Sequence, residues 1–328
     1  MRAHLASIVD QAISHVPVGA LDVVLDIGSN DGTLLNAYPS EVHRIGFEPS
    51  DISDEGSHQV VRDFFSAEAF MAASGGQRAK IVTAIAMFYD LEKPLVFLKD
   101  VRDVLHPRGI AILEMNYLGA MLSHAAADHI GHEHLVYYSV TALAHLARQA
   151  GLRMAWASEN QSNGGSIRVG LTHPDDLPSS DSVTRFLASE RFTREELQTF
   201  TCEASWHLRD LGRFVRRVSA GGRKVYVLGA STRGITILHV AGLDRQHLAV
   251  AVERDERKLG RLYTGFGIPI ISEEQARAEK PDFMLVLPYH FADEIRVRER
   301  IYLEQGGALI IPLSTPRLIT KDGVKPLC

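Results

Sequence analysis

Residues 23–35 read VVLDIGSNDGTLL, a largely apolar run followed by a polar loop with glycines at positions 28 and 32. The apolar run predicts a buried strand, and the residues after the loop predict the start of a helix. Glycine lets a ligand approach the backbone, and the free N–H groups of a helix start bind polar groups. This stretch therefore predicts an α/β fold with a ligand site at the end of its first strand.

The loop is acidic, because it carries Asp26 and Asp31. These carboxylates would repel a pyrophosphate but attract a sulfonium donor with an ammonium group. The Gly-x-x-x-Gly spacing also differs from the Gly-x-Gly-x-x-Gly of dinucleotide sites. Glu48 ends the next predicted strand, where a carboxylate can accept both ribose hydroxyls. The contacts expected for such a donor are Asp26, Gly28, Asn30, Asp31, Gly32, Glu48, Asp63, Ala86 and Met87. A ligand-free tight turn is the alternative for the loop, and a surface position is the alternative for Asp63.

Length and composition limit the class of protein. The chain has 328 residues, of which 45% are hydrophobic and 23% charged, so it has room for two globular domains. The net charge of −5 argues against a nucleic-acid binder. The apolar stretches are shorter than the ~20 residues that span a bilayer, and no signal-peptide core is present, so we expect a cytoplasmic protein without a membrane partner. Cys202 and Cys328 are too few for a disulfide framework or a multi-cysteine zinc site.

The chain divides into three predicted parts. Residues 1–192 form an α/β domain with an N-terminal helix, and residues 223–328 form a second Rossmann-like α/β domain. Strands of the first domain are expected at 23–27, 44–47, 81–84, 110–114, 153–158 and 166–171, with a reversal at 106–109, where proline and glycine stand close together. Strands of the second are expected at 224–228, 248–252, 283–287 and 308–312.

A long helix is predicted between the domains, over residues 193–222. Thr193 and Glu196 form a Thr-x-x-Glu capping box at its start, and Gly221 and Gly222 mark its end. Apolar residues recur at helical spacing on one face, at 197, 200, 204, 208, 211 and 215. We expect this helix to bridge the two domains.

A histidine-rich segment supplies the candidate reacting groups. His134 is the candidate base, because removal of a proton beside a ketone near neutral pH suits an imidazole, and Glu133 is placed to orient the substrate or the ring. A hydrogen-bonded structural histidine is one alternative. A metal site made by His124, His129, His132 and His134 is another, although no fixed ligand pattern supports it. Tyr137 and Tyr138 are expected to pack at the start of the next helix.

Candidate substrate ligands lie in three stretches. Asn163 and Arg168 belong to a turn and strand that also read as a plain hairpin. Ser231, Thr232 and Arg233 follow the first strand of the second domain, where hydroxyls, a guanidinium and a helix start favour a diphosphate. A Rossmann-like turn without a ligand is the alternative there. Tyr289 and His290 are candidates for stacking on the substrate, or for core packing. Glu253 stands in a charged run, residues 253–258, that usually marks a solvated face.

Seven of these motifs, in order, resemble the sugar C-methyltransferases of deoxysugar biosynthesis, over nearly the whole chain. They are DIGSNDG at 26–32, FEPS at 47–50, AMFYDLE at 86–92, HEHLVYYS at 132–139, NGGSIR at 163–168, LGASTRG at 228–234 and LPYHF at 287–291. The resemblance implies a class I methyltransferase core that binds S-adenosylmethionine and a C-terminal domain that helps to bind a nucleoside-diphosphate 4-keto sugar. It also implies His134 as the base with Glu133 beside it, Gly28 and Glu48 as donor contacts, and Ser231 and Arg233 as substrate-loop residues.

The sequence departs from this family in two places. Family members usually begin with a cysteine-rich zinc module, whereas this sequence starts where they enter the methyltransferase core, so no zinc or other metal is expected. Gly131 stands where the family often has tyrosine, sometimes cysteine, so a phenol that could assist an enolate is absent.

The function expected from these observations is C-methylation of a nucleotide-linked 4-keto-deoxysugar through an enolate formed by His134, with S-adenosylhomocysteine as product. One alternative is methylation of oxygen or nitrogen on a related substrate, which needs no enolate. A non-catalytic binding homologue is the other. The expected partner is the nucleotide sugar and not a nucleic acid. A homodimer is compatible with the sequence.

Overall fold

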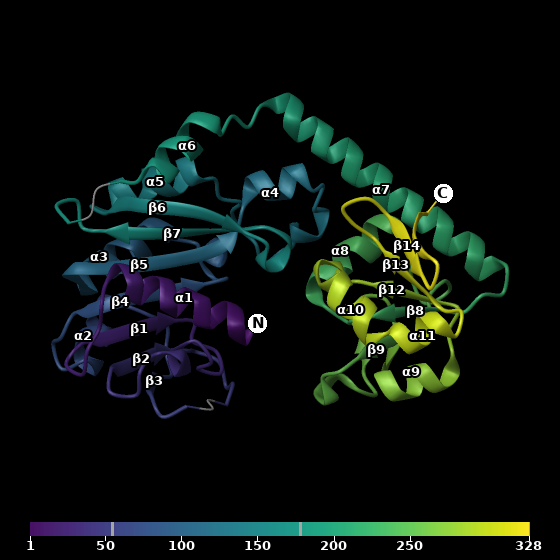
Figure 1. The fold of residues 1–328 in the computed structure, drawn as a ribbon, viewed down its shortest axis with the longest axis horizontal. Coiled ribbons are helices and arrows are strands. Elements are labelled where there is room, and N and C mark those ends of the chain that lie inside the picture. The colour runs from purple at the N-terminus through teal and green to yellow at the C-terminus, as the bar shows by residue number, and fades with distance from the viewer. Residues whose placement is uncertain (54–55, 177–178, 328) are drawn as a thin grey trace. The chain divides into compact units, whose positions relative to one another are not determined.

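The computed structural model describes residues 1–53, 56–176 and 179–327, so Cys328 lies outside the described residues, whereas Cys202 is exposed and free. The chain forms two compact units, each with its own sheet (Figure 1). Unit 1 contains residues 1–119 and 133–191, and unit 2 contains residues 120–132 together with the chain from 192 onward. This division differs from the expected one, because residues 120–132 and the long helix both pack as parts of unit 2.

Unit 1 is built on a seven-stranded sheet in the order β3-β2-β1-β4-β5-β7-β6. Strands β3, β2, β1, β4 and β5 run parallel, and β7 runs antiparallel to β5 and β6. Because β2 and β4 flank β1 on opposite sides, the carboxyl end of β1 is a topological switch point, where open α/β sheets bind ligands. The strands are β1 (Val23–Ile27), β2 (His43–Phe47), β3 (Gln59–Val61), β4 (Ala79–Ile85), β5 (Leu105–Asn116), β6 (Arg153–Asn160) and β7 (Ser166–Thr172). The six expected strands are confirmed, and β3 is an addition.

Helix α1 (Arg2–His15) packs against one face of this sheet (Figure 1). Its buried residues Ile8, Val9 and Ala12 join a core that includes Ile81 and Ile110 of the sheet. Burial of the larger side chains, Ile8 and Val9, contributes about 1.5–3 kcal/mol each to stability. The other helices of the unit are α2 (Ala67–Ala73), α3 (Pro94–Val104), α5 (Val140–Gln149) and α6 (Asp181–Ser189), with 3₁₀ turns η1 (Leu35–Ala37), η2 (Phe88–Asp90) and η4 (Ser162–Gly164). Helix α4 (Leu118–Ser123) crosses the boundary between the units.

Two local predictions in unit 1 are wrong. Residues 106–109 do not reverse the chain but lie within β5, where the register with β4 shifts between the pairs Leu105–Ala79 and Ile110–Ile81. The register shift brings the backbones of the two strands close together at Gly109, where a Cβ atom would lie 2.8 Å from the Lys80 carbonyl oxygen, so glycine is needed there. The loop after β1 leads only into the short η1 turn, because Pro39 restricts the residue before it and ends helical geometry.

Unit 2 holds an eight-stranded sheet in the order β10-β11-β9-β8-β12-β13-β14-β15. The strands from β11 to β13 are parallel, and β10, β14 and β15 extend the sheet as antiparallel edges. Strand β8 has neighbours on both sides, as β1 has in unit 1. The strands are β8 (Val225–Leu228), β9 (Ala251–Glu253), β10 (Leu262–Tyr263), β11 (Ile268–Ser272), β12 (Phe283–Val286), β13 (Ala308–Ile311), β14 (Arg317–Thr320) and β15 (Gly323–Pro326). The edge strands were not foreseen.

The longest helix of unit 2, α7 (Arg194–Ala220), confirms the capping box at Thr193 and Glu196. Five of the six apolar positions on its predicted face are buried, whereas Leu197 is 44% exposed. The remaining helices are α8 (Thr232–Ala241), α9 (Glu273–Glu279), α10 (Ala292–Arg298) and α11 (Arg300–Glu304), with 3₁₀ turns η3 (Ala127–His129), η5 (Glu256–Lys258) and η6 (Tyr289–Phe291). Among the described residues, no helix is both long and apolar enough to cross a membrane.

Candidate active site

The loop after β1 turns on three residues with positive φ, Gly28 (74°), Asn30 (51°) and Gly32 (75°). The N–H of Gly28 donates to the carbonyl oxygen of Phe47 at 2.8 Å, which fastens the loop to β2. A Cβ atom added at Gly28 would lie 3.5 Å from Met87 Cγ. Gly28 and Met87 therefore face each other across the carboxyl ends of β1 and β4, where the absent side chain of glycine leaves room for a ligand.

Glu48, which follows β2, is 8% exposed and fastens the same loop. Its Oε2 accepts from Asn30 N and its Oε1 accepts from Ser50 N, both at 2.9 Å. Partial burial alone would raise the pKa of Glu48, but the hydrogen bonds from Ser50 and Asn30 outweigh burial and the pKa is lowered. Glu48 is therefore ionised at neutral pH and suited to accept ribose hydroxyls.

Asp26 lies inside unit 1 and is only 3% exposed. Thr83 Oγ1 of β4 donates to Asp26 Oδ1 at 2.6 Å. Burial raises the pKa of Asp26 to about 7, against the opposing effect of the Thr83 hydrogen bond. The negative charge of the loop at neutral pH therefore rests mainly on Glu48 and Asp31, whose pKa values are both lowered, that of Asp31 chiefly by a hydrogen bond from Thr33.

Replacing Asp26 with asparagine is expected to remove a pH-dependent loss of stability. The pKa of Asp26 is about 7 in the folded protein and 3.8 ordinarily, so the folded state holds the extra proton and stability falls as pH rises from about 4 to about 7. Asparagine can still accept from Thr83 but does not ionise. Between pH 5 and pH 8, urea unfolding of the wild type should lose about 2–3 kcal/mol more than Asp26→Asn. Parallel stability curves would contradict the raised pKa.

Three further residues expected at the donor site differ in their surroundings. Ala86 has a φ of 56°, unusual for a residue with a Cβ atom, and its N–H donates to the Glu114 carbonyl oxygen at 2.8 Å. Backbone strain of this kind is concentrated at functional sites. Met87 is half-buried beside Gly28, whereas Asp63 is exposed and its Oδ1 accepts from Phe64 N at 2.7 Å. Their roles as donor contacts stay predictions.

His134 and Glu133 lie in the loop before α5, where His134 is half-buried and Glu133 is exposed. The His134 ring lies 4.4 Å from the Tyr89 ring, centroid to centroid. The N–H groups of Leu135 and Val136 both donate to the Tyr89 carbonyl oxygen, at 3.0 and 3.3 Å. Because Tyr89 belongs to η2, just after β4, this segment is fastened beyond the strand end that carries Ala86 and Met87. Tyr138 is buried and packs 5.0 Å from Phe88, just ahead of the Ser139 cap of α5, as expected.

Asp90 was missed by the sequence reasoning. Partial burial raises the pKa of Asp90, the charge of His134 lowers it, and that of Glu133 raises it. The carboxylate is therefore close enough to both groups to interact electrostatically. A single aspartate after two aromatic residues has no spacing that links it to residues 133–134, so the sequence held no signal for it.

The expected substrate loop of unit 2 follows β8 and begins at Gly229, whose φ is 87°. Ser231 caps α8, because its Oγ accepts from Gly234 N at 3.2 Å. The Tyr263 hydroxyl donates to the Ser231 carbonyl oxygen at 2.5 Å, and Thr232 is exposed at the first position of the helix. Here the predicted strand, loop and helix start are all present.

Arg233 and Tyr289, both expected to hold substrate, contact Asp128, and their roles as substrate ligands stay predictions. The Arg233 guanidinium lies 2.5 Å from Asp128 Oδ2, and the Tyr289 hydroxyl donates to Asp128 Oδ1 at 2.7 Å. Asp128 is 1% exposed. Burial, and then the charge of Arg233, lower the pKa of His290 to about 4, so His290 is neutral at physiological pH. The contact of Asp128 with residues more than a hundred positions away gave no signal in the sequence.

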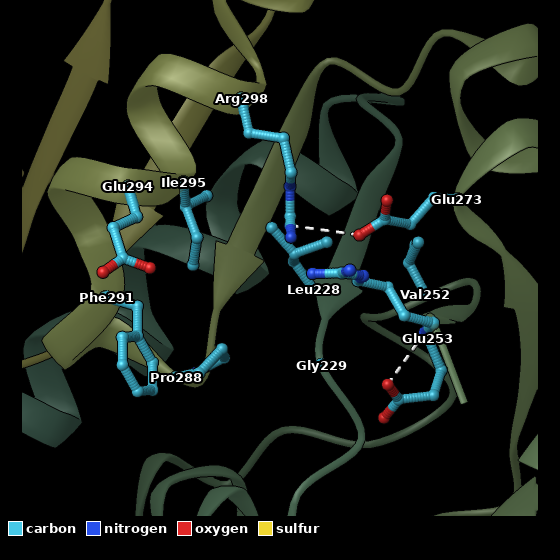
Figure 2. Close-up of a pocket in the computed structure, with 11 residues that line it drawn as sticks. Leu228, Gly229, Val252, Glu253, Glu273, Pro288, Phe291, Glu294, Ile295 and Arg298 are labelled. Carbon is cyan, nitrogen blue, oxygen red and sulfur yellow. Dashed lines mark hydrogen bonds and ion pairs between the residues drawn. The ribbon is translucent and has the colours of Figure 1, made fainter. Parts of the chain in front are cut away.

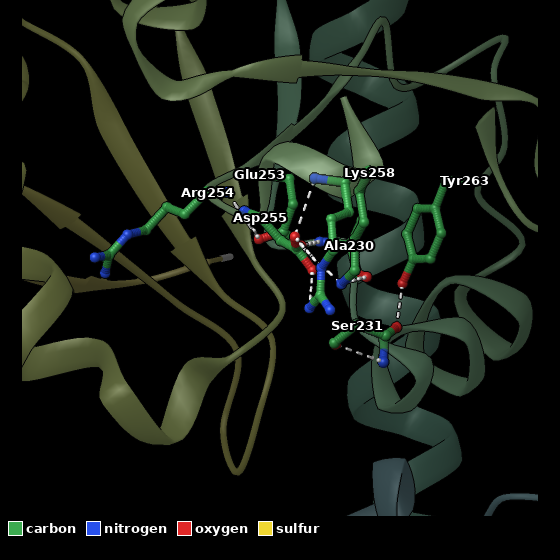
Figure 3. A network of polar contacts seen from close by, with 9 residues as sticks. Ala230, Ser231, Glu253, Arg254, Asp255, Lys258 and Tyr263 are labelled. Atoms are coloured by element: carbon green, nitrogen blue, oxygen red, sulfur yellow. Dashed lines mark hydrogen bonds and ion pairs between the residues drawn. The ribbon is translucent and has the colours of Figure 1, made fainter. Parts of the chain in front are cut away.

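Glu253 in unit 2 accepts hydrogen bonds from the backbone of the loop after β8, as Glu48 does for the loop after β1 in unit 1 (Figure 3). Its place in a charged run had suggested only a solvated face. Its Oε2 accepts from Ala230 N at 3.1 Å and its Oε1 accepts from Arg254 N at 2.8 Å. Lys258 Nζ adds an ion pair at 3.2 Å. Partial burial opposes ionisation, but these hydrogen bonds and Lys258 lower the pKa of Glu253. Figure 3 shows the Arg254 side chain extended away from this network.

A cavity of about 520 Å³ opens beside this network at the carboxyl ends of β8, β9 and β12 (Figure 2). In Figure 2, Phe291 and Ile295 face Val252 and Glu253 across the pocket, and Arg298 reaches toward Glu273, with Nη2 and Oε1 3.1 Å apart. Its size lies in the range of small-molecule sites. The lining is Leu228, Gly229, Val252, Glu253, Arg254, Glu273, Pro288, Phe291, Glu294, Ile295 and Arg298.

Comparisons with known proteins match both units. Residues 4–155 match the model of a methyltransferase domain, and residues 161–314 match that of the C-methyltransferase C-terminal domain. The chain is 29% identical over 330 residues to C-methyltransferase NovU of Streptomyces niveus, covering 97% of this chain and 79% of that protein. The chain is an S-adenosylmethionine-dependent methyltransferase. Its fold class is the expected one.

Solved methyltransferase structures resemble about half of the enzyme. An Archaeoglobus fulgidus S-adenosylmethionine-dependent methyltransferase has 14% identity and a TM-score of 0.41, covering 52% of this chain and 94% of its own. A Clostridium acetobutylicum counterpart has 10% identity and a TM-score of 0.39, covering 53% and 92%.

The methyltransferase buries an ion pair near the carboxyl end of β5. Arg168 Nε lies 2.6 Å from Glu114 Oε2, and the two side chains are 8% and 4% exposed. His4 Nε2 of α1 lies 2.5 Å from Glu114 Oε1. Arg168 was expected to bind substrate oxygens, whereas the structure pairs it with Glu114. Asn163 lies in η4 with a φ of 52°, between β6 and β7 of the predicted hairpin.

No group of three or more His, Cys, Asp or Glu side chains in the described parts of the chain is arranged to hold a metal ion. The donor S-adenosylmethionine fits the residues present at the end of β1. Gly28 leaves the backbone accessible, Glu48 offers an ionised carboxylate, and Asp31 adds a second negative charge for a cationic ligand.

Proposed function

We propose that the enzyme methylates a carbon atom beside the ketone of a nucleoside-diphosphate 4-keto-deoxysugar. The match of residues 161–314 to a C-methyltransferase C-terminal domain and the name of the relative support a carbon acceptor. The observation that carries the chemistry is the fastening of the His134 segment to Tyr89, directly after the strand end with Ala86 and Met87.

In this mechanism, bound S-adenosylmethionine supplies a methyl group on a cationic sulfur, at the β1 and β4 ends. Glu48 and the backbone of Gly28 orient the donor. His134 accepts the proton from the carbon beside the ketone, which leaves an enolate with a nucleophilic carbon, and Glu133 and Asp90 hold the imidazole that has become charged.

The direct test is exchange of the substrate proton. A panel of nucleoside-diphosphate 4-keto-6-deoxysugars is incubated with the enzyme and S-adenosylhomocysteine in deuterium oxide, and the hydrogens beside the ketone are followed by NMR. We expect enzyme-dependent deuterium uptake at one carbon, and methylation of that same carbon once the donor replaces its product. Methyl transfer without uptake would favour an oxygen or nitrogen acceptor. Neither uptake nor transfer across the panel would overturn the proposal.

We place the nucleotide of the substrate in the cavity of unit 2. Lys258 pairs with Glu253 and so reduces the repulsion between that carboxylate and an anion, and Arg254 lines the cavity beside it. The N-terminus of α8, whose first N–H groups follow the Ser231 cap, favours a phosphate at the same end of the sheet.

Replacing Arg254 with alanine is expected to weaken binding of thymidine diphosphate or uridine diphosphate about 10-fold, because one charge-assisted hydrogen bond is worth about 1.5 kcal/mol or more. The measurement is calorimetry on the full chain. Arg257→Ala is the matched control, since Arg257 is exposed and paired with Asp255 at 2.9 Å. Equal losses in the two variants would contradict a specific role for Arg254.

A further inference from the structure

Residues 120–132 interrupt the sequence of unit 1 but pack as part of unit 2, and we call residues 127–132 of this segment the strap. Asp128 is its first anchor, gripped by Arg233 at 2.5 Å and by the Tyr289 hydroxyl at 2.7 Å. Asp128 is 1% exposed, and burial of its carboxylate without these partners would cost several kcal/mol of stability. We therefore expect this contact to persist in the folded protein.

The second anchor of the strap lies two residues further along. Thr236 Oγ1 of α8 donates to the Ile130 carbonyl oxygen at 2.6 Å. Arg233 and Thr236 are three residues apart in α8 and therefore lie on the same face of that helix. The η3 turn of the strap packs against α8. The first turns of α8 therefore hold the strap at two points.

Helix α8 begins at the loop where the proposed function places phosphate. Ser231 caps the helix and Arg233 lies in its first turn, directly after that loop. A phosphate bound at these N–H groups acts on the same turn that holds Asp128. Occupancy of the loop and the position of the strap are thus linked by one short piece of helix.

On the other side, the candidate base is held by unit 1. Leu135 N and Val136 N donate to the Tyr89 carbonyl oxygen, immediately after His134. Ile130 and His134 are four residues apart, and an extended chain spans at most about 3.6 Å per residue, so the tether is at most about 14 Å long. Along the chain, His134 therefore lies between Ile130, which unit 2 holds, and Leu135 and Val136, which unit 1 holds.

We propose that the strap transmits occupancy of the 229–234 loop to His134, with Asp128 and Thr236 as positioning residues for the base. This inference rests on the proposed function, because it assumes that the loop binds the phosphates of the substrate.

The test is hydrogen exchange on the full chain, with thymidine diphosphate as the probe ligand. In the wild type, the ligand should slow exchange in the 229–234 loop and also at the Ile130, Leu135 and Val136 amides. In Thr236→Val, which keeps the side-chain shape but cannot donate to Ile130, protection of the loop should remain while protection of Leu135 and Val136 is lost. Thr236→Ser, which restores the donor, should recover it.

A kinetic readout separates positioning from damage to the fold. Thr236→Val should lower kcat about 3- to 10-fold at unchanged KM for S-adenosylmethionine, as expected when a base is displaced by a small distance. Thr236→Ser should regain at least half of the rate. Asp128→Asn should show the same pattern more strongly, and Thr236→Val keeps the proposal testable if the asparagine variant does not fold.

The outcomes distinguish the two levels of the proposal. Ligand protection confined to the 229–234 loop of the wild type would overturn the strap and leave the nucleotide site standing. No protection anywhere would overturn the nucleotide site and the strap together. Protection of Leu135 and Val136 that survives in Thr236→Val and Asp128→Asn would also overturn the strap.

Discussion

His134→Ala is expected to lower kcat by about 10²–10⁴-fold, the usual contribution of a general base. In the proposed mechanism the His134 imidazole takes the proton from the carbon beside the ketone, and its half-buried ring lies 4.4 Å from the Tyr89 ring. Binding of S-adenosylhomocysteine, measured by calorimetry, should stay within about 2-fold, because His134 is not among the residues expected to contact the donor. The rate is measured by S-adenosylhomocysteine release with the 4-keto sugar that the panel identifies.

His145→Ala is the matched control, since His145 is an exposed histidine of α5 that pairs with Arg148 of the same helix. It should retain the wild-type rate. Deuterium uptake into the ketone substrate should disappear in His134→Ala together with turnover. If His134→Ala binds the donor and still turns over at a near-normal rate, the base assignment fails.

Glu48→Ala is expected to weaken S-adenosylhomocysteine binding about 10- to 100-fold, because hydrogen bonds to a charged group contribute about 1.5–3 kcal/mol. The loss has two sources. The carboxylate accepts from Asn30 N and Ser50 N, so its removal loosens the loop, and the acceptors for the ribose hydroxyls disappear. Calorimetry gives the dissociation constant, and thermal unfolding without ligand reports the loosening separately.

Glu41→Ala provides the control for Glu48, because Glu41 is exposed two residues before β2 and lies away from the loop after β1. Its donor affinity should match the wild type. Glu48→Gln keeps the size of the side chain and should fall between the two, since the amide oxygen can still accept from one N–H. Wild-type affinity in Glu48→Ala would remove Glu48 from the donor site.

Strongly patterned elements were predictable from the sequence. Strand β1 was predicted with its observed bounds, because a short, largely apolar run before a polar glycine loop is typical of a strand that is buried on both faces. The start of α7 was predicted from Thr193 and Glu196, whose capping bonds are local. Glu48 was placed at the end of β2 by the same local logic, and the structure shows why it is oriented: two neighbouring N–H groups hold it.

The failures share a cause, which is that the deciding contact lies far away in the sequence. Pro107 and Gly109 indicate a reversal locally, but pairing with β4 keeps the chain extended and makes the glycine part of a register shift. The Arg233–Asp128 ion pair is a contact of the same long-range kind and had no signal in the sequence, while the role of Arg233 as a phosphate ligand stays a prediction. Glu253 looked solvated in a charged run, and only its place beside Ala230 reveals a role like that of Glu48.

The strap makes unit 2 discontinuous in the chain, and this affects how the enzyme is made. During synthesis Asp128 leaves the ribosome about 100 residues before Arg233, which at about 5–20 residues per second is a wait of roughly 5–20 seconds. Throughout that interval the carboxylate must remain hydrated, because its guanidinium and phenol partners do not yet exist. A fragment that begins at residue 192 would be translated without the strap, and its Arg233 would lack the anion that neutralises it in the intact chain.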